Sequence, residues 1–208
     1  MTQRALKIYS DYKSPYAYLA KDLAYDLERE TGAQVEWLPY TLDIPAYLGS
    51  ARLDAAGTLV EASRNAHQWR RVKYSYMDCR REANRRGLTI LGPRKIFDSS
   101  PANIGMLYAK RHGVFRGYHD RVFELFWKRE LDLESPAALL AVLQGCGAPT
   151  GAFLSFLRGE GDRELSERRT AAEAAGVFGV SSFLFPDGDL YWGREHLPQV
   201  RARLLAGC

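Results

Sequence analysis

The sequence has few cysteines, and they lie far apart. Only three occur in 208 residues, at Cys79, Cys146 and Cys208, so the chain has no Cys-x-x-Cys pair and no zinc-ligand spacing. A local redox disulfide and a disulfide framework are therefore excluded, which points to a reducing compartment. The four histidines form no HxxH or HExxH pair. We therefore expect no metal site.

Long apolar runs are absent as well. A membrane-spanning helix needs roughly 18 consecutive apolar residues, and no such stretch occurs. The segment 1–11 is broken by charged residues and lacks the continuous apolar core of a signal peptide. From these absences we expect a cytoplasmic protein that does not associate with membranes.

A strong charge imbalance is also missing. The chain has 29 Lys and Arg against 25 Asp and Glu, a net charge of +4. This is too small to demand a nucleic-acid partner, and no nucleic-acid-binding module is recognisable. The pI near 9.0 still permits anionic ligands.

The composition is that of an ordinary globular protein, with 46% hydrophobic, 12% aromatic and 26% charged residues. A disordered chain is excluded. The length suits one large domain, or one domain with an insertion.

The opening forty residues predict a strand, a helix and a second strand. The segment 6–9 alternates apolar and polar residues and contains strand formers. Ser14 and Pro15 then fit the N-cap and first position of a helix that continues to Gly32. The segment 34–40 alternates again, so this short βαβ unit predicts a parallel strand pair.

The remainder predicts a helical block followed by a hairpin and a last helix. Apolar residues recur at helical spacing over about 63–169, with Ser135 and Pro136 as a second N-cap pair. Strands are expected over 182–185 and 190–192, joined by a turn, and a helix over 195–205. This order predicts an α/β, thioredoxin-like fold with a helical insertion between its βαβ and ββα halves. The expected domains are 1–58 with 176–208, and an inserted helical domain over 59–175.

Ser14 is the candidate reactive residue. In a thioredoxin-like arrangement the chemistry lies where the first strand meets its helix, because the helix N-terminus favours negative charge. Ser14 and Ala17 stand where a redox protein would need its cysteine pair, so thiol-disulfide exchange is not expected. From spacing alone, the favoured interpretation is that Ser14 serves only as a helix cap.

Two segments at opposite ends of the chain resemble a known family. The segment 11–19, DYKSPYAYL, is similar to the serine-containing active-site motif of 2-hydroxychromene-2-carboxylate isomerases and kappa-class glutathione transferases, both in the DsbA-like branch of the thioredoxin superfamily. The segments 176–180, 183–185 and 190–197 resemble that family's C-terminal hairpin and following helix start. With 69–74 similar to its basic helix, the resemblance covers nearly the whole chain.

The resemblance implies a glutathione-dependent enzyme of aromatic compound catabolism, with glutathione as cofactor and a homodimer as the assembly. Ser14 would donate a hydrogen bond to the glutathione thiolate. Val180 and Ser181 would contribute backbone groups, Glu195 would pair with the γ-glutamyl ammonium, and Arg194 would hold a carboxylate. An isomerase is the first expectation and a kappa-like transferase the second. Both reactions use one activated thiolate, so the sequence does not separate them. Without the resemblance, Arg194 and Glu195 would read as an ordinary helix start.

The chain departs from the family pattern at two places. Ser181 stands where the family usually has a proline, which is expected to be cis and to face the active site. The segment 54–58, DAAGT, lacks the asparagine that the family tends to place after the second strand. These departures leave open a third interpretation, a thioredoxin-fold binding protein that has lost catalysis.

The segment 64–86 is strongly basic, with eight Lys and Arg against two acidic residues, a balance of +6. A solvated helix face is the ordinary interpretation of such a run. If the segment bordered a cleft, it would attract a small-molecule substrate that carries a carboxylate. The substrate is therefore expected to be anionic or electrophilic.

Overall fold

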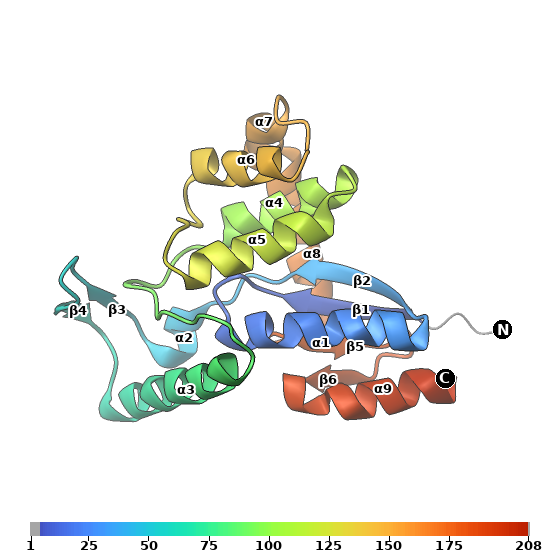
Figure 1. Ribbon diagram of the computed structural model, residues 1–208, viewed down its shortest axis with the longest axis horizontal. Coiled ribbons are helices and arrows are strands. Elements are labelled where there is room, and N and C mark those ends of the chain that lie inside the picture. The colour runs from blue at the N-terminus through green and yellow to red at the C-terminus, as the bar shows by residue number, and fades with distance from the viewer. Residues whose placement is uncertain (1–4, 208) are drawn as a thin grey trace.

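A four-stranded mixed sheet forms the centre of the computed structural model, which describes residues 5–207. The strand order is β2 (Gln34–Pro39), β1 (Ala5–Ser10), β5 (Ser182–Leu184), β6 (Leu190–Trp192). β1 pairs with β2 in parallel, whereas β5 is antiparallel to both β1 and β6. The predicted parallel pair and C-terminal hairpin are therefore confirmed, and both ends of the chain contribute to one sheet (Figure 1).

Helix α1 (Pro15–Thr31) begins and ends as the sequence predicts. Ser14 Oγ accepts a hydrogen bond from the N–H of Ala17 at 3.2 Å, and Pro15 occupies the first turn, where its missing N–H costs nothing. Gly32 closes the helix with φ +65°, a left-handed conformation that favours glycine.

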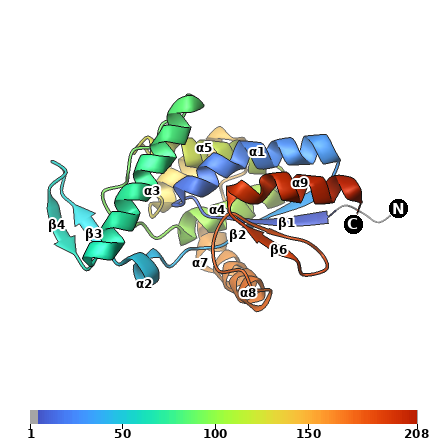
Figure 2. The same ribbon diagram turned by 90° about the horizontal axis from the view of Figure 1, so that it is seen from below.

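Helices cover both faces of the sheet. α1 and α9 (Leu197–Ala206) lie on one face, and α8 (Glu160–Ala174) lies on the other (Figure 2). Ile8 of β1 and Phe183 of β5 are fully buried and belong to the apolar core formed with α1 and α9. Alternate residues of each strand point to the same face, which explains why this side of the sheet is apolar.

The middle of the chain forms the expected helical block. Its bounds are α3 (Ala66–Arg85), α4 (Ser100–Arg111), α5 (Phe115–Trp127), α6 (Pro136–Gly145) and α7 (Phe153–Arg158), which leads into α8. Ser135 caps α6 by accepting from the N–H of Ala138 at 3.3 Å, as predicted. One apolar core joins this block to the sheet, and its members include Tyr9 of β1 and Leu143 of α6. Within residues 5–207, no helix is both long and apolar enough to cross a membrane.

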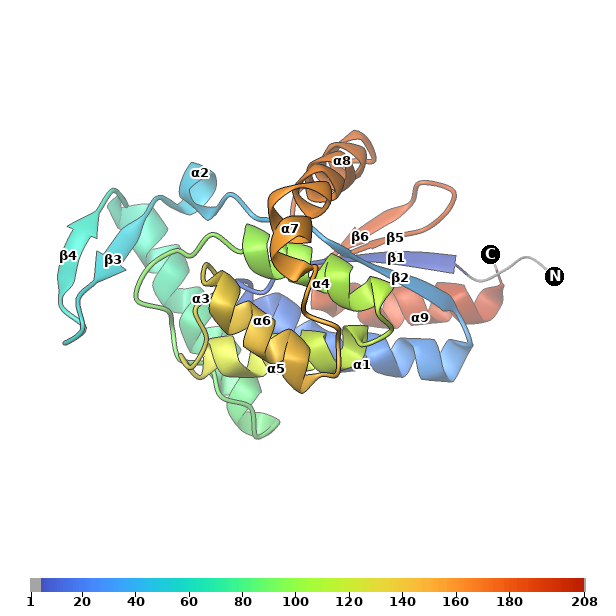
Figure 3. The same ribbon diagram turned by 90° about the horizontal axis from the view of Figure 1, so that it is seen from above.

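Two local features differ from the sequence prediction. A short helix α2 (Ile44–Leu48) and a hairpin of β3 (Ala51–Leu53) and β4 (Leu59–Ala62) follow β2, and Figure 3 shows the hairpin at the end of the molecule remote from both termini. The segment 54–58 is the turn of this hairpin, so the domain boundary predicted at residue 58 falls inside one supersecondary unit. The last helix begins two residues later than expected, because 194–196 form a separate 3₁₀ turn.

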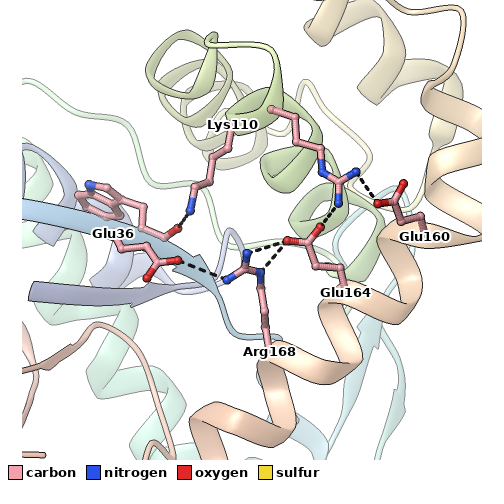
Figure 4. Close-up of polar contacts among 7 residues, drawn as sticks. Glu36, Lys110, Glu160, Glu164 and Arg168 are labelled. Carbon is pink, nitrogen blue, oxygen red and sulfur yellow. Dashed lines mark hydrogen bonds and ion pairs between the residues drawn. The ribbon is translucent and has the colours of Figure 1, made fainter. Parts of the chain in front are cut away.

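A polar network attaches α8 to the sheet and to α4 (Figure 4). Arg168 of α8 lies between two carboxylates, 2.7 Å from Glu164 on its own helix and 3.4 Å from Glu36 on β2. Lys110 of α4 donates to the backbone carbonyl of Trp37 on the same strand. These contacts fix the helical block against β2.

Candidate active site

Sheet register brings the two motif segments together. Tyr9 of β1 pairs with Ser182 of β5 in antiparallel fashion. The residues that follow β1, up to Ser14, therefore lie beside the residues that precede β5, Val180 and Ser181. The Val180–Ser181 peptide bond is cis.

A cavity of about 520 Å³ opens at this junction. Ser14 and Val180 both line it, together with parts of α2, α3, α5 and the loop before α4. Its walls are mostly apolar or aromatic, formed by Tyr16, Leu42, Ile44, Tyr47, Val72, Tyr76, Ile96, Phe97, Phe126, Phe178 and Trp192. A cavity of this size and character suits a small molecule with a flat ring.

The charged groups that line the cavity are all cationic. Lys13, Arg64, Arg71 and Lys95 belong to the lining, and no acidic residue does among the described residues. Lys95 is paired with Glu134, while the side chain of Arg71 has no hydrogen bond or ion pair with another described residue. The cavity therefore favours an anionic ligand.

Ser14 is buried at the helix end of this cavity, with 5% of its surface exposed. Its oxygen already accepts from the N–H of Ala17, so the lone pair facing the helix is used. No described residue accepts from its hydroxyl, which leaves the proton available to a ligand. The α1 N-terminus adds a favourable field for negative charge at the same place.

The backbone before β5 carries unpaired polar groups. Ser181 C=O accepts from Gly193 N–H at 2.9 Å, and Ser182 Oγ donates to Gly179 C=O at 2.8 Å. The N–H and C=O of Val180, by contrast, make no hydrogen bond with any described residue. An unpaired backbone donor and acceptor in a residue that lines a cavity can pair with an extended peptide ligand.

Arg194 and Glu195 lie in a different place from Ser14. They line a second depression of about 610 Å³ between α1 and the start of α9, and neither belongs to the lining of the Ser14 cavity. Arg194 forms an ion pair with Glu82 of α3 at 3.3 Å. The structure thus brings Ser14 and Val180 together and places Arg194 and Glu195 in a neighbouring depression.

Several cavity residues had no role in the sequence-based prediction. Lys13 belongs to the quoted motif but received no function there, although a charged residue inside that motif was a usable signal. Arg64 and Arg71 are the basic residues of the segment 64–86 that line the cavity. Lys95 and Tyr47 come from irregular or short elements that no periodic pattern marks.

Tyr16 and Cys79 form a polar layer between α1 and α3. Tyr16 lines the cavity and donates to Asp78 Oδ2 at 3.2 Å. Burial raises the pKa of Tyr16, and burial also raises the pKa of the Cys79 thiol to about 12. Cys79 is fully buried and does not line the cavity, so it is a neutral core thiol.

This geometry agrees with comparisons to known proteins. The family model of the DSBA-like thioredoxin domain matches residues 5–205. The chain belongs to the DsbA-like thioredoxin family. The fold class expected from the sequence is therefore confirmed, and solved structures of this DsbA-like fold superpose on nearly the whole chain.

Curated relatives confirm the narrower resemblance. A 2-hydroxychromene-2-carboxylate isomerase of Sphingobium xenophagum is 28% identical over 203 residues, which cover 97% of this chain and 98% of the relative. The isomerase of Pseudomonas putida is 28% identical over 195 residues, covering 91% and 88%. A solved 2-hydroxychromene-2-carboxylate isomerase superposes with a TM-score of 0.74 at 23% identity, covering 96% and 94%. The cytosolic disulfide reductase DsbM of Pseudomonas aeruginosa, solved with GSH, gives a TM-score of 0.64 at 17% identity, covering 97% and 98%.

Proposed function

We propose that this DsbA-like protein is a glutathione-dependent isomerase of the 2-hydroxychromene-2-carboxylate type. The observation that carries the proposal is the Ser14 cavity, which combines a hydroxyl proton with no acceptor among the described residues, a helix N-terminus, aromatic walls and, within residues 5–207, charged lining residues that are all cationic. The curated relatives that match nearly the whole chain have the same activity in their names.

The residues present fit glutathione. The unpaired N–H and C=O of Val180 offer a backbone pair to a tripeptide, and the Ser14 hydroxyl offers a donor to its sulfur. A structural neighbour, DsbM, was solved with GSH. Arg194 and Glu195 stay predicted ligands for the two ends of glutathione, at the neighbouring depression.

Bound glutathione would supply a nucleophilic thiolate for reversible addition to a conjugated carbon of the substrate, which would let the former double bond rotate. Ser14 holds the sulfur in its anionic form by donating a hydrogen bond, with support from the α1 N-terminus. The aromatic walls, including Tyr76 and Phe97, hold a flat substrate ring. Arg64 and Arg71 attract a carboxylate on that substrate.

The test is turnover of 2-hydroxychromene-2-carboxylate by protein freed of small molecules, followed by ultraviolet absorbance. We expect isomerisation after addition of glutathione and none after addition of S-methylglutathione, a matched control with no free thiol. Calorimetry should show that both compounds bind, because Val180 offers the same backbone pair to each. Equal turnover without any thiol would contradict the role of glutathione.

Two other results would point to the alternative interpretations. Conjugation of glutathione to an electrophilic aromatic halide, without isomerisation, would favour a kappa-like transferase. Binding of an aromatic carboxylate without turnover in either assay would favour a non-catalytic binding protein. A homodimer and a cytoplasmic location stay predictions, to be checked by light scattering and cell fractionation.

A further inference from the structure

Lys13 is a buried cation on the wall of the Ser14 cavity. Its side chain is 6% exposed, and it lines the cavity directly beside Ser14 in the chain. An ammonium group carries three hydrogen-bond donors, and a buried one is costly unless these are satisfied. Among the described residues no acceptor forms a hydrogen bond with Lys13 Nζ. The nearest opposite charge is Asp11 Oδ2 at 3.9 Å, beyond hydrogen-bond distance.

Asp11 is fully buried and is occupied by other donors. Its Oδ2 accepts from the Leu42 N–H at 2.8 Å, and its Oδ1 lies 3.4 Å from Asn103 Nδ2 and 3.5 Å from the Lys13 N–H. Burial raises the pKa of Asp11, and the positive charge of Lys13 acts in the opposite direction. Asp11 therefore accepts hydrogen bonds from the backbone of the turn and lies near the Lys13 ammonium. It accepts no hydrogen bond from that ammonium.

Lys13 and Asp11 differ in their position relative to the cavity, and this difference leaves a positive charge on the cavity wall. Lys13 belongs to the cavity lining, whereas Asp11 does not. A ligand in the cavity therefore contacts Lys13 and not Asp11. The other groups with charge or a titratable proton on the lining are Tyr16, Tyr47, Arg64, Arg71, Tyr76 and Lys95, and none of them is a carboxylate.

We infer that Lys13 is a catalytic residue that pairs through its ammonium group with the sulfur anion at Ser14. This inference rests on the proposed function, because the sulfur belongs to bound glutathione. Ser14 supplies one hydrogen bond to that sulfur, and Lys13 supplies the compensating charge at the same end of the cavity. Arg64 and Arg71 are then left for the carboxylate of the substrate.

The experiment places a sulfur at this position without any ligand. Ser14→Cys introduces one thiol, and the pH dependence of its alkylation gives its pKa, measured on the peptide that contains position 14. Lys13→Met and Lys13→Arg are then added to this variant. Lys7→Met is the matched control, since Lys7 is an exposed lysine of the adjacent strand β1 that does not line the cavity.

An opposite charge within about 4–6 Å lowers an anion's pKa by about one to three units. We therefore expect Lys13→Met to raise the pKa of the introduced thiol by about one unit or more, a tenfold decrease in its acid dissociation constant. Lys13→Arg should retain the low pKa, and Lys7→Met should leave it unchanged. If Lys13→Met and Lys7→Met have the same effect, the inference is wrong.

Two further measurements separate the loss of the Lys13 charge from a failure of the variant to fold and from a failure of the protein to bind glutathione. Lys13→Met leaves the Asp11 carboxylate buried without a cation, so Asp11→Asn/Lys13→Met provides a charge-balanced version if the single variant fails to fold.

With Ser14 intact, thiolate absorbance of bound glutathione should fall in Lys13→Met. Wild-type protein that binds no glutathione would contradict the proposed function, while the cysteine titration would still decide the role of Lys13. An unchanged thiol pKa with a raised KM for the carboxylate substrate would overturn the inference, because Lys13 would then bind the carboxylate.

Discussion

Replacement of Ser14 by alanine should separate its two roles, because the chain offers a matched serine elsewhere. Ser14 and Ser135 both precede a proline, and both cap a helix by accepting from a backbone N–H, at 3.2 Å and 3.3 Å. Ser135 caps α6 and does not line the cavity. Loss of such a cap costs about 0.5–2 kcal/mol of stability, and a loss of 1 kcal/mol lowers Tm by about 2–4 °C in a chain of this size.

Catalysis should respond very differently at the two positions. Removal of one hydrogen-bond donor to a developing anion typically lowers kcat by about 10²–10³-fold. We therefore expect similar Tm losses for Ser14→Ala and Ser135→Ala, with the large loss of glutathione-dependent isomerisation confined to Ser14→Ala. Calorimetric melting and steady-state kinetics measure the two quantities. If Ser14→Ala retained activity within about twofold of wild type, Ser14 would be a cap and nothing more.

Two predictions concern stability. Burial holds the pKa of His119 well below its ordinary value, so the folded state leaves the imidazole neutral while the unfolded state binds a proton below about pH 6.5. Stability should therefore fall by up to about 1.4 kcal/mol for each pH unit below 6.5, and chemical denaturation should show a weaker pH dependence in His119→Gln. Gly105→Ala would force a methyl group against the fully buried hydroxyl of Tyr118, at a cost of about 1–3 kcal/mol. The control Gly117→Ala meets no atom closer than 3.5 Å on an exposed helix position, and a comparable loss of Tm there would contradict this packing argument.

The parts of the fold that could be predicted are those with strong local signals. The Ser-Pro pairs at residues 14 and 135 marked helix starts, because a hydroxyl cap and a proline at the first position satisfy the same local geometry. The hairpin of β3 and β4 was missed, since each strand is short and residues 59–62 are exposed without alternation. Short exposed strands give no hydrophobic period to detect.

The sequence likewise indicated only part of the arrangement of the candidate site. Ser14 was placed by its position after the first strand and Val180 by the family resemblance, and the sheet register brings these two residues close together. The positions of Arg194 and Glu195 depend on how the 3₁₀ turn meets α3 and α9, including the ion pair with Glu82. No local pattern encodes such a contact between distant elements, so their separation from the Ser14 cavity could not be foreseen.

A serine at the start of α1 also determines what else the site must contain. A cysteine there could become a thiolate and provide the negative charge itself, whereas a hydroxyl stays neutral at physiological pH. Any anionic sulfur must then come from a ligand, and bringing an anion into a buried site costs free energy unless a cation compensates it. Ser14 contributes a dipole but no charge, and a buried ammonium with unsatisfied donors stands next to it in the chain. Lys13 is therefore the group that we propose compensates the charge of a ligand-borne thiolate beside Ser14.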